Sequence, residues 1–157
     1  MREGEPLGLK LVGARAQNWL RQEKSYRAFG TELGRDATPL EAGLDRFVDL
    51  SKDFKGKAAM QEVGIRSKCV TLLIDGPSDA DPWGREALFL DGEKIGRLTS
   101  GGYSAAFGKQ IGMGYVRPDL AEPGTKLKVR MFRDLYDAEV TEDSPYDPTN
   151  AKIRVDG

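Results

Sequence analysis

The chain has 157 residues, 39% hydrophobic and 31% charged, enough for one ordinary domain or two small ones with a modest core. Its formal net charge of −1 provides no long-range field to attract nucleic acid or an anionic membrane surface. The chain contains no histidine and one cysteine, Cys69, which excludes histidine-based catalytic pairs, an intrachain disulfide and a cysteine metal cluster.

The charge and hydropathy patterns argue against nucleic-acid and membrane partners. Lys126, Lys128 and Arg130 alternate with apolar residues, which predicts the solvated face of a strand rather than a phosphate-binding stripe. No apolar run approaches the ~20 residues of a membrane-spanning helix, and residues 1–6 show no secretory signal. We therefore expect a cytoplasmic protein.

The N-terminal part begins with a strand-like alternation at residues 9–12, followed by the best helical pattern in the chain, residues 14–26. Ala16, Trp19 and Leu20 have the spacing of one apolar helix face, and Glu23 continues that row. A carboxylate beside an apolar face needs a partner. Two interpretations are open: an exposed Glu23 paired with Arg27 one turn later, or a ligand-binding Glu23.

Residues 29–64 mix turns with short elements. Thr38, Pro39 and Glu41 form the pattern of a capping box that starts only one turn, because Gly43 follows. Residues 45–50 predict a strand. Residues 56–61 predict a short helix with Gly64 as its C-cap.

From about residue 63 onward, strand-sized apolar runs and turns dominate the sequence. The six predicted strands are residues 69–74, 87–90, 95–99, 111–116, 127–132 and 137–141. Asp91-Gly92 suits a tight hairpin turn, and Gly101-Gly102 is expected to break the chain after the third strand. A backbone anion site at these glycines is the less favoured alternative to a simple turn.

The resulting fold class is α+β. We expect a short helical and strand-containing segment, residues 1–62, followed by a six-stranded antiparallel Greek-key or jelly-roll-like barrel, residues 63–157. Phosphate-binding loops and the common catalytic motifs are missing from the sequence, so the residues by themselves specify no self-sufficient active site.

Three stretches in a fixed order resemble the C-terminal part of the folate-dependent aminomethyltransferases, the glycine cleavage T-protein family. They are residues 13–30 (GARAQNWLRQEKSYRAFG), residues 36–44 with 52–59 (DATPLEAGL and KDFKGKAA), and residues 96–104 (GRLTSGGYS) with 112–116 and 123–125. The form Arg21-x-Glu23-Lys24-x-Tyr26-Arg27, together with Tyr146-Asp147-Pro148, looks most like the folate module of dimethylglycine and sarcosine dehydrogenases.

The resemblance implies that residues 1–62 are the tail of a folate-binding domain and that Glu23 binds the pterin ring of tetrahydrofolate. A carboxylate can accept two hydrogen bonds from the ring's amino group and adjacent N–H. Lys52 occupies the place of the basic residue that meets the carboxylate tail of folate, as a point charge without the fork of arginine. Ala151 stands where some members have an aromatic residue that reaches the ligand.

The resemblance also implies that parts of the enzyme lie outside this sequence. The family's catalytic aspartate precedes the matched region, so no catalytic residue is assigned here. Tetrahydrofolate would bind only together with that upstream region, and FAD would belong to a separate module. The expected partner is therefore an upstream folate or oxidase region, or a separate subunit. The alternative is a non-catalytic barrel that binds a partner subunit or forms a homodimer through an exposed apolar patch.

Overall fold

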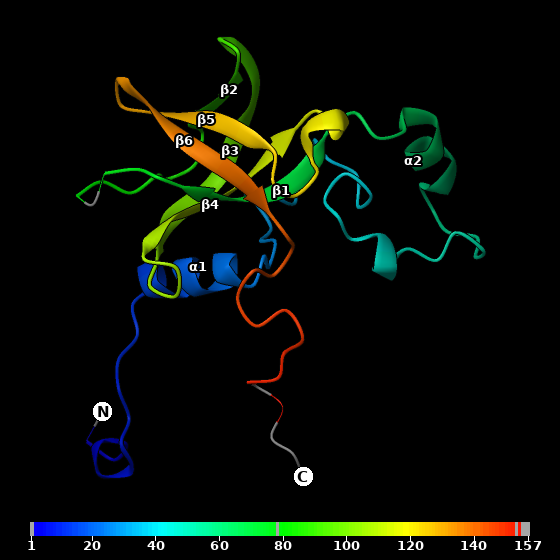
Figure 1. Ribbon diagram of the computed structural model, residues 1–157. Coiled ribbons are helices and arrows are strands. Elements are labelled where there is room, and N and C mark those ends of the chain that lie inside the picture. The colour runs from blue at the N-terminus through cyan, green and yellow to red at the C-terminus, as the bar shows by residue number, and fades with distance from the viewer. Residues whose placement is uncertain (1, 78, 153, 155–157) are drawn as a thin grey trace.

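A closed barrel of six antiparallel strands forms the centre of the protein in the computed structural model, which describes residues 2–77, 79–152 and 154 (Figure 1). The strands are β1 (Lys68–Ile74), β2 (Ala87–Leu90), β3 (Glu93–Ser104), β4 (Lys109–Val116), β5 (Lys126–Met131) and β6 (Asp134–Thr141). The predicted number of strands and the predicted barrel are both confirmed.

The strand order β1-β4-β3-β2-β5-β6 contains a Greek key, because β2, β3 and β4 form consecutive hairpins and β1 lies beside β4. The barrel closes where β1 pairs with β6.

Strict alternation of buried and exposed residues along β5 confirms that its basic side chains form an exposed face. Cys69 is buried in β1, and burial raises the pKa of its thiol to about 12, so it stays protonated.

β3 is longer than predicted. The sequence predicted a break at Gly101-Gly102, but β3 runs through both glycines and pairs with β4 as far as Ser104. The glycines serve close packing: a Cβ built on Gly102 would lie 2.1 Å from Cδ1 of Trp19. The predicted Asp91-Gly92 turn is confirmed, with φ of 50° and 82° at the two residues.

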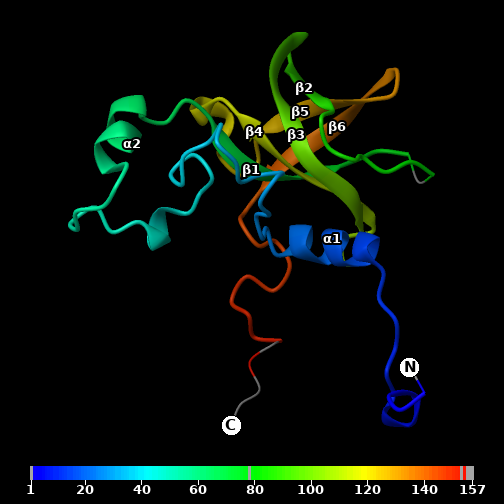
Figure 2. The same cartoon turned by 180° about the vertical axis from the view of Figure 1, so that it is seen from behind.

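Helix α1 (Ala14–Glu23) lies across the end of the barrel where β3 passes into β4 (Figures 1 and 2). It ends before the predicted Tyr26, and Ser25 then takes a left-handed conformation with φ of 51°. The predicted apolar face is only partly correct, because Leu20 is exposed while Gln22 and Glu23 are the buried residues of the helix.

Both strands predicted in the N-terminal part are wrong. Residues 9–12 are extended but have no partner strand, and the segment 2–13, with a 3-10 turn η1 (Glu5–Leu7), reaches away from the barrel (Figures 1 and 2). Residues 45–50 contain the 3-10 turn η2 (Asp45–Phe47) instead of a strand. In each case the alternation of residues is present but no neighbouring backbone completes a ladder.

The remaining elements are short. Helix α2 (Lys57–Val63) begins one residue later than expected and ends at the predicted C-cap Gly64, whose φ is 66°. A 3-10 turn, η3 (Pro118–Leu120), connects β4 to β5. Over the residues that the structure describes, no helix combines the length and apolar character needed to cross a membrane.

The predicted capping box is confirmed and has a second role. The backbone N–H of Glu41 donates to Thr38 Oγ1 (3.2 Å), and that of Thr38 donates to Glu41 Oε2 (2.8 Å). Arg66 Nε also donates to Glu41 Oε1 (2.9 Å), and the N–H of Cys69 donates to Glu41 O (2.8 Å). Glu41 thereby joins the N-terminal part to the start of β1.

These contacts make Glu41 a source of pH-dependent stability. Hydrogen bonds from Arg66, aided by those from Thr38, lower its pKa from 4.5 to about 2. A lowered pKa means that the stabilisation is fully present above pH 4.5 and is lost as the pH falls toward 2. Glu41→Gln is therefore expected to destabilise the protein by about 1–3 kcal/mol at pH 7.

Urea unfolding of the parent and Glu41→Gln proteins between pH 7 and pH 3 measures this difference. The gap should shrink below about pH 4.5. Glu139→Gln, on the exposed face of β6, is the control and should leave the curve unchanged. A gap that stays constant down to pH 3 would contradict the role given to Glu41.

Candidate functional site

The end of α1 places a carboxylate against the barrel. Glu23 is only 5% exposed, and its Oε1 accepts hydrogen bonds from Ser104 Oγ (2.5 Å) and from the backbone N–H of Ala106 (3.2 Å). Ser104 is the last residue of β3, and Ala106 lies in the turn between β3 and β4. Glu23 Oε2 accepts no hydrogen bond from any residue that the structure describes, so one oxygen is fixed and the other is available.

The pairing of Glu23 with Arg27, one of the two interpretations of the sequence, is wrong. Arg27 turns toward the C-terminal segment instead, where its Nη1 and Nη2 donate to both carboxylate oxygens of Asp143 (2.8 and 2.9 Å). Nη1 also donates to Ser25 O (2.6 Å). The left-handed turn at Ser25 separates the two side chains, which a continuous helix would have placed one turn apart.

The C-terminal segment forms a further side of this region. The N–H of Tyr146 donates to Glu23 O (3.0 Å), while Lys24 Nζ donates to Asp147 O (2.6 Å) and Asn150 Oδ1 (2.7 Å). Ala151 follows in an exposed turn. Three separate stretches therefore meet around Glu23: the end of α1, the β3–β4 turn and residues 143–150.

Lys52 lies elsewhere. Its side chain is 76% exposed and its Nζ is 3.5 Å from Asp49 Oδ2. It follows η2 rather than the strand that was expected to precede it. The segment from η2 to α2 lies beside the barrel, well apart from α1 (Figures 1 and 2). The structure thus brings Glu23 together with Ser104 but does not bring Lys52 to the same place.

A second buried carboxylate, Glu32, was missed by the sequence analysis. Its Oε1 accepts hydrogen bonds from Thr99 Oγ1 (2.7 Å) and Ser100 Oγ (2.5 Å). Its Oε2 accepts from Arg21 Nη1 (2.9 Å), the Ala28 N–H (3.0 Å) and Thr31 Oγ1 (2.7 Å). Burial raises the pKa of Glu32, but the hydrogen bonds from Ser100, Ala28, Thr99 and Thr31 outweigh it and lower the pKa below its ordinary value.

A bulge in β3 explains how neighbouring hydroxyls reach one oxygen. The register with β4 shifts between Leu98 and Ser100, which makes Thr99 the extra residue. Without the bulge, Thr99 and Ser100 would point to opposite faces of the sheet. Sequence inspection offered no signal for this, because the bulge depends on the pairing with β4.

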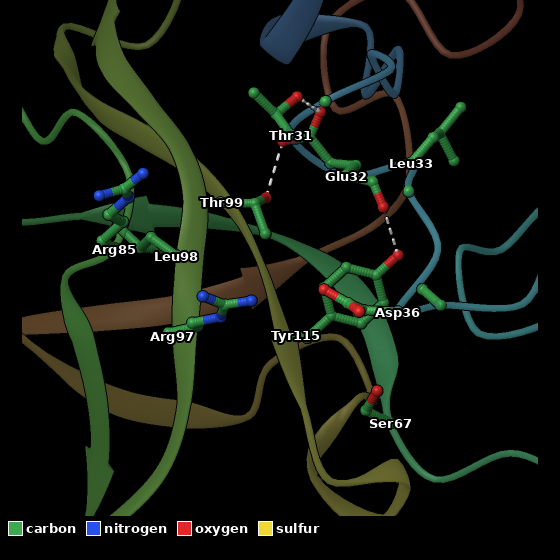
Figure 3. Close-up of a pocket in the computed structure, with 13 residues that line it drawn as sticks. Thr31, Glu32, Leu33, Asp36, Ser67, Arg85, Arg97, Leu98, Thr99 and Tyr115 are labelled. Carbon is green, nitrogen blue, oxygen red and sulfur yellow. Dashed lines mark hydrogen bonds between the residues drawn. The ribbon is translucent and has the colours of Figure 1, made fainter.

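Glu32 borders a cavity of about 400 Å³ between residues 30–37 and the strands β3 and β4 (Figure 3). Thr99 and Tyr115 reach the Glu32 segment from these strands, and the Tyr115 hydroxyl donates to Glu32 O (2.7 Å). Because both carboxylate oxygens of Glu32 already have donors, Glu32 is suited to holding the segment in place. Glu23 has one oxygen without a donor among the described residues, which makes it the candidate of the two for contacting a ligand.

Within the described ranges, no group of three or more cysteine and acidic side chains is arranged to hold a metal ion. The candidate site consists of the buried Glu23 carboxylate, which is held by Ser104 and by one backbone donor, the Ala106 N–H. Trp19, one helical turn before Glu23, and Tyr103, next to Ser104, are in edge contact at 6.3 Å. Glu23 Oε2, which has no donor among the described residues, can accept hydrogen bonds from the N–H groups of a ligand.

Comparison with known proteins gives matches to two family models. Residues 1–52 match the GCVT N-terminal domain and residues 68–147 match the glycine cleavage T-protein C-terminal barrel domain. The predicted division at residues 62 and 63 falls between the two matches and stays a prediction.

The relatives are longer than this chain. It is 37% identical to mitochondrial dimethylglycine dehydrogenase of Rattus norvegicus over 166 residues, covering 100% of this chain and 19% of that protein. It is 34% identical to mitochondrial aminomethyltransferase of Flaveria trinervia over 151 residues, covering 90% of this chain and 36% of the relative.

A solved structure shows the same fold. The glycine cleavage system aminomethyltransferase T of Bartonella henselae superimposes with a TM-score of 0.79 at 25% identity, over 88% of this chain and 40% of that one. The chain therefore spans between about a fifth and two fifths of the proteins it matches.

Proposed function

Because the chain belongs to the glycine cleavage T-protein family, we propose that it forms the C-terminal part of a unit that transfers a one-carbon unit from a methylated or aminomethyl amine to tetrahydrofolate. In this role it supplies one wall of the folate pocket. The observation that supports the proposal is the Glu23 carboxylate, which is buried, fixed through Oε1 and available at Oε2.

The pterin ring is the part of tetrahydrofolate that suits Glu23. Its amino group and adjacent ring N–H are donors, and a buried carboxylate accepts them without competing water. Lys52 is the proposed contact for the carboxylate tail, since its ammonium is exposed and its ion pair with Asp49 is loose. The two contacts are independent, because the residues lie on different parts of the chain.

The catalytic aspartate is proposed to come from a folate-binding region that precedes this sequence in an intact enzyme, or from a separate subunit. FAD, where the enzyme oxidises its amine, is proposed to lie in a separate module. In this proposal, no residue of this chain acts as an acid or base in the one-carbon transfer or in the oxidation of the amine.

Two halves of the ligand test this proposal on the chain as it stands. In NMR titrations, pterin is expected to shift the amide signals near Ala106 and the end of α1, and p-aminobenzoylglutamate those near Lys52. Glu23→Gln should weaken pterin binding about 10- to 100-fold, the effect of hydrogen bonds to a charged group, and leave the other half unaffected. Lys52→Gln should show the reverse pattern, with a smaller effect.

Glu139→Gln is the matched control, because Glu139 is an exposed carboxylate on the outer face of β6. Pterin binding that Glu23→Gln leaves unchanged would contradict the assignment. Joining the chain to an upstream folate-binding region should raise the affinity for tetrahydrofolate, since the second wall of the pocket is then present.

A binding module for another subunit is the alternative function, and one observation favours it. Leu7, Leu9, Leu11 and Val12 are all exposed on the segment that reaches away from the barrel (Figure 1). Such a run of aliphatic side chains is typical of an interface. This alternative requires a stable partner subunit or a homodimer, and analytical ultracentrifugation would detect a homodimer.

A further inference from the structure

We propose that Ser104 is a positioning residue, which orients the Glu23 carboxylate so that Oε2 is presented to the ligand. The barrel would then hold the pterin-binding group in place, although the group itself lies on α1. This inference rests on the proposed function and deepens it, because it assigns the β3–β4 turn a role in ligand recognition.

The hydrogen-bond direction at Ser104 is determined by its neighbours. Ser104 is fully buried, and its Oγ accepts the backbone N–H of Phe107 (3.3 Å). An ionised carboxylate only accepts, so the short contact of 2.5 Å to Glu23 Oε1 is made by the Ser104 hydroxyl hydrogen. The hydroxyl therefore has one partner on each side and a single orientation.

Two donors on one oxygen fix the plane of the carboxylate. The Ala106 N–H approaches the same Oε1 at 3.2 Å, which opposes rotation of the group about its terminal bond. The oxygen that remains, Oε2, then points in one direction before any ligand arrives. A binding group that is already oriented loses less conformational freedom when the ligand binds.

The turn itself is held tightly by the barrel. β3 and β4 remain paired to Ser104 and Lys109, and the N–H of Gly108 donates to Ser104 O (2.9 Å). Gly108 has φ of 64°, which glycine adopts without strain. The helix is held on the other side by Trp19, which lies directly over Gly102. Ser104 and Glu23 therefore belong to two elements whose relative position is fixed independently.

Amide exchange tests the contact without any ligand. In the full chain, Ser104→Ala and Glu23→Gln should both accelerate hydrogen exchange at Ala106, which loses its fixed acceptor. The amide of Leu72 in β1 should stay protected, which shows that the barrel is intact. Ser67→Ala is the control, since the Ser67 hydroxyl makes no hydrogen bond to a described residue. Unchanged exchange at Ala106 in both variants overturns the proposal.

Pterin titration of the same variants tests the role in binding. Ser104→Ala should weaken pterin binding about tenfold, the factor for one hydrogen bond to a charged group, and Ser104→Thr should restore it. In the Glu23→Gln background, Ser104→Ala should have no further effect, because it acts through Glu23.

The remaining outcomes separate the two proposals. Equal weakening by Ser104→Ala in both backgrounds overturns the positioning role, because Ser104 then acts independently of Glu23. Pterin binding that depends on Ser104 but not on Glu23 overturns it as well. If pterin binds neither to the parent chain nor to the chain joined to an upstream folate-binding region, the proposed function and the assignment of pterin to Glu23 both fail. Exchange at Ala106 still decides whether Ser104 orients the carboxylate.

Discussion

Gly102→Ala is expected to be among the most damaging substitutions in the protein. The new methyl group would lie 2.1 Å from Cδ1 and 2.3 Å from Nε1 of Trp19, far inside van der Waals contact. Neither residue can move easily. Gly102 is paired within the β3–β4 ladder, and Trp19, a residue of α1, packs its ring against the edge of Tyr103. We expect a loss of about 2–3 kcal/mol of unfolding free energy, the upper range for overpacked sites.

The clash also has a functional consequence. If the protein relieves it by moving α1 away from β3, Glu23 moves away from Ser104, and pterin binding falls even in molecules that stay folded. Chemical denaturation measures the loss of unfolding free energy, and the pterin titration measures the loss of binding. Gly34→Ala is the matched control, since its Cβ would meet no atom within 4 Å and its φ is not positive.

A second substitution shows whether the clash is the cause. Trp19→Ala removes the ring that the methyl group would strike, so the double variant Gly102→Ala, Trp19→Ala should be less destabilised than the two single changes together. Strictly additive losses would mean that Gly102 matters for another reason, such as strand flexibility.

The parts of the fold that the sequence predicted depend on local patterns. Strand-sized apolar runs separated by turns predicted the six strands, Asp91-Gly92 predicted a tight turn, and Thr38 with Glu41 predicted a capping box. Each signal involves residues a few positions apart. The family resemblance added the identity of the barrel, which matching relatives and a solved structure support.

The failures share a physical cause, which is dependence on residues far away in the chain. The strand patterns at residues 9–12 and 45–50 had no partner backbone to pair with. Gly101-Gly102 looked like a break because its packing partners, Pro82 and Trp19, are distant in sequence. The same is true of Glu23, whose spacing suggested Arg27 as a partner while the fold supplied Ser104.

Glu32 is the clearest case of a residue whose importance depends on the fold. It follows Thr31 in an irregular stretch where a carboxylate would ordinarily be exposed. In the structure, its side chain is completely buried and joins α1, residues 28–31 and the bulge in β3. A buried carboxylate is stable only while its charge is compensated, and here Arg21 and four further donors compensate it.

Glu32→Gln is therefore expected to cost about 3–5 kcal/mol at pH 7, because Arg21 keeps its charge in a largely buried place without a counter-ion. Since hydrogen bonds lower the pKa of Glu32, this difference should be largest above its ordinary value of 4.5 and shrink as the pH falls. Urea denaturation at pH 7 and pH 4 measures both. Glu93→Gln is the control, because Glu93 is exposed and its ion pair with Arg117 is long, at 4.0 Å, and therefore contributes little to stability.

Removing the charge of Arg21 as well separates the two possible causes of this loss. If the uncompensated guanidinium is responsible, Arg21→Met combined with Glu32→Gln should be less destabilising than the sum of the two single changes. If the loss comes mainly from the hydroxyl and backbone donors that face Glu32, the second change should add its full cost. Because residues 21 and 32 flank the turn that follows Glu23, the first outcome would make the Arg21–Glu32 ion pair the element that holds the candidate site against the barrel.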